Sequence, residues 1–283
     1  MKLSVFTVST PDLTPEQLIV HAKEAGLQGI EWRYKEISKE LRKQPPSFWG
    51  NNYCTIDAAQ VTDTELDALS ESVQRHGLTS IALAPYLTAG DVEGTELAMR
   101  RAARLGAKYI RVGVPRYDRT ENYNVLYKFE LDYLAKVEEL SKRYGVKGLI
   151  ETHHVTIAPS ASLSYRLVNS FDPDHIGVLY DPGNMVFEGY ENYRMGMELL
   201  GPYLAHVHVK NAAWFPGETP EDPWKARMYT MDRGIVDWLQ VVRDLKSVGY
   251  DGWFGVEDFS GTHDSPTMLK TYVNWFRTLL EQA

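Results

Sequence analysis

Apolar and polar positions follow a repeated order along the chain: an amphipathic stretch, a glycine, an apolar residue, and a short apolar run. The amphipathic stretches predict helices over residues 15–25, 64–75, 96–105 and 126–144. Each glycine is expected to end its helix in the left-handed conformation, with the next residue packing back on the last turn. This repeated phrase, the last residue of the amphipathic stretch followed by glycine and an apolar residue, occurs at Ala25-Gly26-Leu27, His76-Gly77-Leu78, Leu105-Gly106-Ala107, Tyr144-Gly145-Val146 and Val248-Gly249-Tyr250.

The short apolar runs are rich in β-branched and aromatic residues, which is typical of strands buried on both faces. With the first run, they predict eight strands at residues 3–8, 29–32, 80–83, 109–112, 148–151, 176–180, 204–209 and 253–257. Eight alternating β and α units in 283 residues predict an α/β protein, a single (β/α)8 TIM barrel domain over residues 1–283. An open doubly wound sheet is the alternative, but no Gly-x-Gly-x-x-Gly follows the first strand.

Two connections are long, and both follow strands, on the barrel face where active sites are built. Residues 35–57 follow the second strand and include Trp49 and Tyr53, and residues 212–234 follow the seventh and include Trp214 and Trp224. Loops of this length are usually lids or binding loops. We therefore expect an aromatic lid, with Trp214 as a substrate-contacting residue. The alternative is a packed aromatic cap that does not touch substrate.

Composition and charge narrow the class of protein. The hydrophobic share of 43% excludes a disordered chain, and the single cysteine, Cys54, excludes a disulfide scaffold. A formal net charge of −8 disfavours nucleic acid as a partner. No apolar run approaches the ~20 residues that span a bilayer, and the first residues lack a secretory signal pattern. We expect a soluble, cytoplasmic protein.

Four side chains that can bind metal stand at or near the carboxyl ends of strands five to eight: Glu151, Asp181, His208 and Glu257. Adjacent strands of a barrel bring such residues to one mouth, where three unpaired carboxylates would repel each other unless a cation compensates them. One imidazole among oxygen ligands suits Mn²⁺ or Mg²⁺, with Co²⁺ or Zn²⁺ as alternatives. The alternative without a metal is a set of ordinary polar strand ends.

Four segments in order resemble a known family: Ile150-Glu151-Thr152-His153, Gly177 to Asn184, His206 to Asn211, and Gly249 to Glu257. They resemble the sugar isomerase and epimerase barrels of the xylose isomerase-like superfamily, which includes ketose 3-epimerases, hydroxypyruvate isomerases and inosose dehydratases. The resemblance implies that Glu151, Asp181, His208 and Glu257 bind one divalent metal ion. It also implies that Glu151 and Glu257 move protons, and that His153 contacts substrate.

Other polar residues near the strand ends have two interpretations each. Lys210 follows His208 by two positions and can hold substrate oxygens or pair with an acid. Arg111, with Glu31, Arg33 and Arg116, can bind substrate, or these side chains can pair with one another. Strand alternation turns His154 away from the face of Glu151 and His153, so we expect it to be structural. His206 lies deeper in the barrel than His208 and is expected to be a core or supporting residue.

The ligand set favours removal of a proton next to a carbonyl of a keto-sugar or related polyol ketone through an enediolate, giving epimerisation or isomerisation. Dehydration of the inosose type, or cleavage of a C-glycoside with a small β-rich partner subunit, would use the same site. An apurinic-site endonuclease, which the same superfamily contains, is disfavoured because Asn184 and Gly234 stand where that pattern needs histidines. We expect a homo-oligomer that acts on a small carbohydrate.

Overall fold

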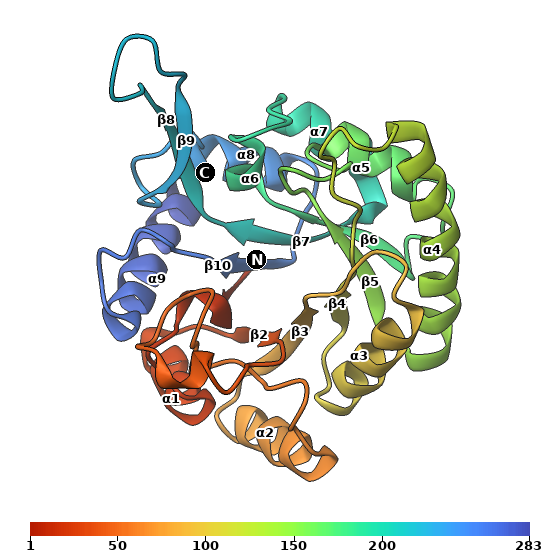
Figure 1. Cartoon of the computed structure of the whole chain (residues 1–283). Coiled ribbons are helices and arrows are strands. Elements are labelled where there is room, and N and C mark those ends of the chain that lie inside the picture. The colour runs from red at the N-terminus through yellow and green to blue at the C-terminus, as the bar shows by residue number, and fades with distance from the viewer.

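The computed structural model describes residues 1–283 as a closed barrel of parallel strands with helices around it (Figure 1). Around the barrel, the strands follow the order β1-β10-β7-β6-β5-β4-β3-β2. Their bounds are β1 Lys2–Phe6, β2 Gly29–Tyr34, β3 Thr79–Pro85, β4 Tyr109–Arg111, β5 Lys147–Glu151, β6 Ile176–Tyr180, β7 Leu204–Val209 and β10 Trp253–Val256. The predicted (β/α)8 barrel is confirmed.

The outer layer consists of helices that follow the strands in the chain and pack against them. These helices are α1 Pro15–Ala25, α2 Asp63–Arg75, α3 Val92–Arg104, α4 Tyr123–Tyr144, α5 Ala161–Val168, α6 Pro182–Met185, α7 Tyr193–Leu200, α8 Trp238–Ser247 and α9 Ser265–Gln282. None of them combines the length and the apolar character needed to cross a membrane.

Local sequence explains where the helices begin and end, as α1 illustrates. Thr14 and Gln17 form a capping box, and Pro15 occupies the first helical turn, where its missing N–H costs nothing. Gly26 ends the helix with φ +88°, a left-handed conformation that costs glycine no Cβ clash. The other four glycines of the repeated phrase also have positive φ, so the predicted role of the phrase is confirmed.

Strand alternation places polar side chains inside the barrel mouth. On β5, Leu149 packs with Leu179 and Ala205 in a small cluster of its own, whereas Ile150 belongs to the main core beneath the helices. Since successive side chains of a strand point to opposite faces, Glu151 lies on the interior side with Leu149, one step nearer the carboxyl end. The same alternation turns His206 and His208 of β7 inward, because Val207 and Val209 belong to the main core.

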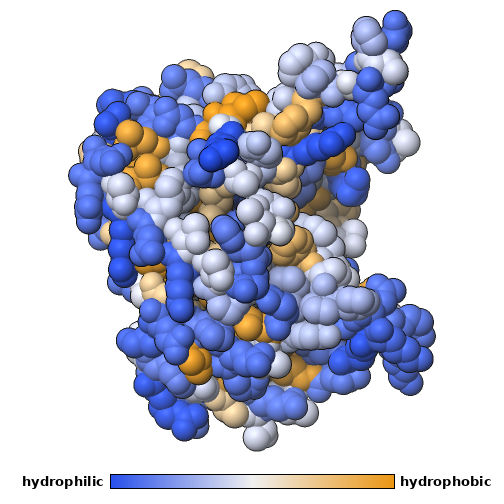
Figure 2. All heavy atoms as spheres, turned by 90° about the vertical axis from the view of Figure 1, so that its left-hand side faces the viewer, coloured by the Kyte–Doolittle hydropathy of each residue, from blue (hydrophilic) through white to orange (hydrophobic).

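The connection after β7 is long, as expected, but it is not irregular. It forms an antiparallel hairpin of β8 (Asn211–Phe215) and β9 (Lys225–Tyr229), which projects from the barrel (Figure 1). Seen from the side, the hairpin is the upper projection from a mainly hydrophilic surface (Figure 2). Burial alternates along β9, and the turn contains Pro216 and Gly217, which suit a reversal of direction.

The connection after β2 is fixed by a buried arginine. The Arg33 side chain donates from Nη1 to Thr55 Oγ1 at 2.6 Å and from Nη2 to the Trp49 carbonyl at 3.0 Å. Its Nε donates to the Tyr86 hydroxyl at 3.3 Å. Arg33 is only 1% exposed and has no carboxylate within ion-pair distance, so it holds this loop rather than pairing with an acid.

Candidate metal centre

The four side chains expected to bind metal meet in the barrel mouth. Ligand atoms of Glu151, Asp181, His208 and Glu257 all lie within 4.8 Å of one another, and all four residues are buried. Glu151 ends β5, Asp181 directly follows β6, His208 lies on β7, and Glu257 directly follows β10. Asp181 is also the N-cap of α6, where its Oδ1 accepts from the Asn184 backbone N–H.

The imidazole of His208 has a nitrogen aimed at the carboxylates. Its Nδ1 lies 3.1 Å from Glu257 Oε2, 3.5 Å from Glu151 Oε1 and 3.8 Å from Asp181 Oδ2. Nevertheless, this buried atom has no hydrogen-bond partner with acceptable geometry. A buried nitrogen left unpaired among three carboxylates is the arrangement that a divalent cation would complete, so the residues fit the implied metal.

Glu31, at the interior of β2, sets the orientation of that imidazole. Its Oε2 lies 2.9 Å from Nε2 of His208 and 2.9 Å from Nε2 of His206. With Glu31 accepting at Nε2, the lone pair of neutral His208 is at Nδ1, on the side of the other carboxylates. Burial would raise the pKa of Glu31, but His208 and His206 hold it well below its usual value. Gly255 leaves room for both rings, because a Cβ there would lie 3.3 Å from His206.

Lys210 pairs with the acids, one of the two outcomes expected for it. Its Nζ lies 2.6 Å from Glu257 Oε2 and 2.7 Å from Asp181 Oδ2. Burial would lower the pKa of Lys210, but the carboxylates of Asp181, Glu257 and Glu151 raise it above its ordinary value, so the side chain is a cation. Gly183 makes space for this arrangement, since a Cβ at that position would collide with the lysine side chain.

Arg111 and Asn184 orient Glu151. The guanidinium of Arg111 donates from Nη1 to Glu151 Oε2 at 2.8 Å. Burial would raise the pKa of Glu151, but Arg111 and His208 hold it well below its usual value. The Asn184 amide lies 3.1 Å from Glu151 Oε1 and 3.0 Å from Asp181 Oδ2, so a single amide donor group holds two of the carboxylates.

The charges of this cluster do not balance. Its carboxylates are Glu31, Glu151, Asp181 and Glu257, and with His208 neutral, as a metal ligand must be, the cations paired with them are Arg111 and Lys210. Four negative charges against two positive ones leave an excess that one divalent ion neutralises. Buried charges need such compensation, so the electrostatics and the unpaired His208 nitrogen point to the same group.

The two adjacent histidines after β5 do not separate as strand alternation predicts. Strand β5 ends at Glu151, so alternation does not continue to His153 and His154. Their rings instead stack with centroids 4.4 Å apart, and His154 also stacks on Phe187 at 4.4 Å. Burial, together with His153 and Lys210, lowers the pKa of His154 to about 4, so this ring is neutral at pH 7.

The aromatic residues beside the cluster come mainly from unexpected positions. The Lys210 ammonium lies 5.7 Å from the ring centroid of Phe259, which in turn packs on Trp49 at 4.8 Å. Arg111 lies 5.1 Å from the ring of Tyr86, directly after β3. Strand alternation could not place Phe259 beside Glu257, because β10 ends at Val256. Nothing in the sequence singled out Tyr86.

Two further candidates for substrate contact, Trp214 and Arg116, lie on the rim of the barrel. Trp214, on β8, is 41% exposed, and its Nε1 donates to the Val186 carbonyl at 2.8 Å. This bond ties strand β8 of the hairpin to the segment after α6. A contact between Trp214 and substrate stays a prediction. Arg116 is exposed beyond β4 and makes no ion pair within 4.0 Å.

The closed barrel and the carboxylate-rich mouth define a class of proteins, and a comparison with known families identifies it. Residues 19–279 match the family described as xylose isomerase-like TIM barrel. The chain belongs to this family. The inosose dehydratase of Geobacillus thermodenitrificans (strain NG80-2) is 24% identical over 232 residues, which are 72% of this chain and 76% of that protein.

Solved structures agree on the fold. The structure of L-ribulose 3-epimerase superposes with a TM-score of 0.75 at 16% identity, covering 99% of this chain and 95% of that one. The IolI protein, whose structure holds a bound zinc atom, superposes with a TM-score of 0.74 at 18% identity, covering 100% of this chain and 99% of that one. At these identities, the likeness shows the fold.

Proposed function

We propose that this protein is a divalent-metal-dependent enzyme that removes a proton next to the carbonyl of a keto-sugar or related polyol ketone, leading to isomerisation or epimerisation. One observation carries the proposal: Glu151, Asp181, His208 and Glu257 place their ligand atoms within 4.8 Å in a buried mouth. The named relatives, an epimerase and a dehydratase, support enzymatic chemistry on polyhydroxylated ketones.

Glu151, Asp181, His208 and Glu257 would hold one metal ion, and the mixed oxygen and nitrogen donors favour Mn²⁺, with Mg²⁺, Co²⁺ and Zn²⁺ as alternatives. The bound ion would act as a Lewis acid that polarises the substrate carbonyl and stabilises negative charge on its oxygen. Glu31 would keep the His208 ring turned toward the ion. The protein's remaining task is to move a proton between substrate carbon and a carboxylate.

Glu151 and Glu257 are the proposed proton carriers. Burial would raise the pKa of Glu257, but His208 and Lys210 lower it, and Glu151 is held ionised in the same way. Both are therefore ready to accept a proton. One carboxylate can remove the proton, and the other can deliver a proton to the planar enediolate. Delivery to the opposite face inverts the configuration of the carbon. His153, Lys210, Arg111 and Trp214 are the proposed substrate-binding residues.

A dehydratase is the second candidate, because an enediolate can also expel a hydroxyl group from the neighbouring carbon. The inosose dehydratase relative, which aligns over 72% of this chain, favours this alternative. Cleavage of a C-glycoside by the same site stays open as well. The structure gives no support to a nuclease. The Asn184 amide donates N–H groups to Glu151 and Asp181, whereas a second metal ion at this position would need a ligand with a free lone pair.

Exchange of substrate hydrogen with solvent tests the proposed reaction class before any product is known. We expect NMR in D₂O to show deuterium entering the carbon next to the carbonyl when the purified chain, Mn²⁺ and a suitable ketose, inosose or 3-oxo sugar are combined. Epimerisation gives exchange with inversion at that carbon, isomerisation gives exchange with a shift of the carbonyl, and dehydration adds loss of water. A panel without any exchange, using metal-loaded protein, would contradict the proposal.

Glu31→Gln tests the support given to His208. The neutral amide oxygen accepts from the imidazoles more weakly than the carboxylate does, so we expect metal affinity to fall by about 10- to 100-fold. Titration with Mn²⁺ measures the change, and circular dichroism shows whether the fold is kept. Glu36→Gln, an exposed change in the loop after β2, is the matched control. An affinity within twofold of the wild-type value would mean that Glu31 does not orient the ligand.

A further inference from the structure

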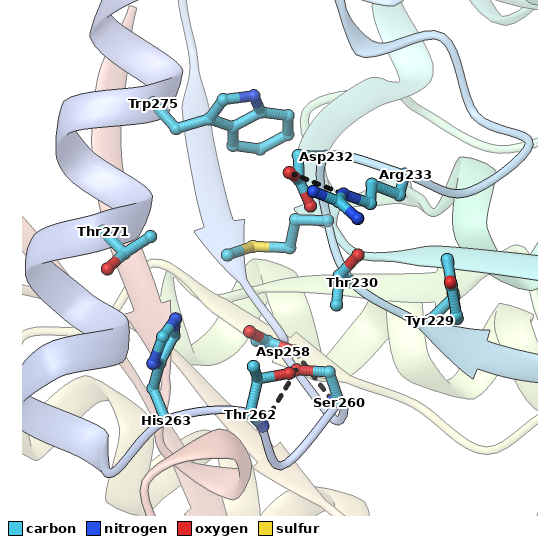
Figure 3. A pocket seen from close by; sticks show the side chains of 11 residues that line it. Tyr229, Thr230, Asp232, Arg233, Asp258, Ser260, Thr262, His263, Thr271 and Trp275 are labelled. Carbon is cyan, nitrogen blue, oxygen red and sulfur yellow. Dashed lines mark hydrogen bonds and ion pairs between the residues drawn. The ribbon is translucent and has the colours of Figure 1, made fainter.

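A second pocket lies between α9 and the end of the β8–β9 hairpin (Figure 3). Its volume is about 470 Å³, toward the lower end of the range for small-molecule sites. Trp275 and Thr271 of α9 line one wall, and Asp232 and Arg233, beyond the hairpin, line the other. This volume suits a ligand of about one sugar ring.

The loop after β10 separates this pocket from the metal centre. Glu257 and Phe259 face the centre, where they contact Lys210. The intervening and following residues, Asp258, Ser260 and Thr262, line the pocket. One short segment therefore supplies side chains to both sites, alternating between them, so the pocket borders the proposed reaction centre.

Asp258 gives the pocket an incompletely satisfied acceptor. The residue is only 8% exposed and makes no ion pair within 4.0 Å. Its Oδ1 accepts from the Ser260 N–H at 2.8 Å, and no protein group donates to Oδ2. This oxygen is accessible from the pocket, so a ligand hydroxyl or a water can donate to it. Vicinal hydroxyl groups are donors that a carboxylate can bind in pairs.

The rest of the lining complements a sugar more closely than an anion. The half-buried indole of Trp275 supplies an aromatic face, and Met231 adds apolar surface nearby. Apolar C–H faces of sugars pack on aromatic rings, while hydroxyls such as those of Thr230 and Thr271 can exchange hydrogen bonds with the ring substituents. The lining carries two carboxylates, Asp232 and Asp258, against the single arginine, Arg233, and this balance disfavours an anion such as phosphate.

We propose that this pocket binds a neutral sugar ring and is the subsite for the part of the substrate beyond the reacting ring. The substrate is then a glycoside or disaccharide carrying a keto group, not a free monosaccharide. That the bound sugar is part of the substrate rests on the proposed function. That the pocket binds a sugar ring does not. Trp275 is its stacking surface, and Asp258 accepts from its hydroxyls.

The first test needs neither metal nor catalysis. Saturation-transfer NMR measures binding of methyl β-D-glucopyranoside to chelator-treated wild-type protein and to the variants Trp275→Leu and Asp258→Asn. Tyr190→Leu is the control, because Tyr190 is an aromatic residue outside the pocket and is 59% exposed. We expect saturable binding that weakens at least tenfold in the two pocket variants and is unchanged in the control. No saturable binding, equal binding in Trp275→Leu, or displacement by inorganic phosphate would overturn the proposal.

The second test connects the pocket to substrate. With a 3-keto glucoside and its free 3-keto sugar in the D₂O assay, Trp275→Leu should raise KM for the glucoside about tenfold and leave kcat within twofold. The free sugar should be unaffected. Equal effects on both compounds would overturn the subsite. If neither compound exchanges in wild type, the proposed function fails, while the metal-free binding result still decides whether the pocket holds a sugar.

Discussion

Glu257→Gln is expected to reduce kcat by roughly 10²- to 10⁴-fold, the usual contribution of a positioned acid or base. Glu257 Oε2 lies 2.6 Å from Lys210 Nζ and 3.1 Å from His208 Nδ1. Glutamine keeps the shape and one oxygen at this position but cannot take a proton from carbon. The loss should therefore appear in turnover more than in folding.

The control for this change separates catalysis from metal loss. Elemental analysis of Glu257→Gln shows whether the ion is retained, and a melting curve shows whether the fold is kept. Glu96→Gln makes the same chemical change on α3, where the carboxylate pairs with Arg143 and Tyr144 far from the cluster. Activity of Glu257→Gln within tenfold of wild type, about 1.4 kcal/mol of barrier, would assign Glu257 a structural role only.

Removal of metal is expected to abolish turnover and to lower the melting temperature. We expect elemental analysis to find one divalent ion per chain, because, once His208 has lost its proton to bind metal, four carboxylates face only two paired cations in the cluster. A ligand at 100 times its Kd stabilises the folded chain by about 2.7 kcal/mol, which corresponds to a shift of several degrees. Adding Mn²⁺ or Co²⁺ to chelator-treated protein should restore both properties.

The pH dependence of metal binding follows from His208. Burial would lower the pKa of its imidazole, but Glu257 and Glu31 raise it well above the ordinary value, so a proton occupies the ring in the metal-free chain. Metal must displace that proton, and apparent affinity should rise with pH. The Asp181→Asn variant should lose the rise in melting temperature that added metal causes. The control Asp174→Asn should keep it, because Asp174 is exposed and precedes the first residue of β6, away from the cluster. The absence of both metal and thermal shift in wild type would remove the basis of the site.

The sequence by itself determined the elements and the residues at the barrel mouth. Helix ends follow local rules, as Thr14, Pro15 and Gly26 show for α1. Parallel barrel strands all end at one rim. Residues at the ends of neighbouring strands are therefore predicted to converge, and Glu151, Asp181, His208 and Glu257 do so. The hairpin was missed, since β8 has no alternating pattern and β9 alternates over only five residues.

Only the tertiary structure decided which side chains support the site. Glu31 contacts His206 and His208 across 175 and 177 residues of sequence, because barrel closure brings β2 and β7 within reach of each other through the interior. Alternation predicts that these residues face inward, but not which of them touch. The same holds for Lys210 between Asp181 and Glu257, for Tyr86 beside Arg111, and for the pocket at Asp258 and Trp275. Local patterns set the direction of a side chain, whereas strand order, register and loop packing set its partner.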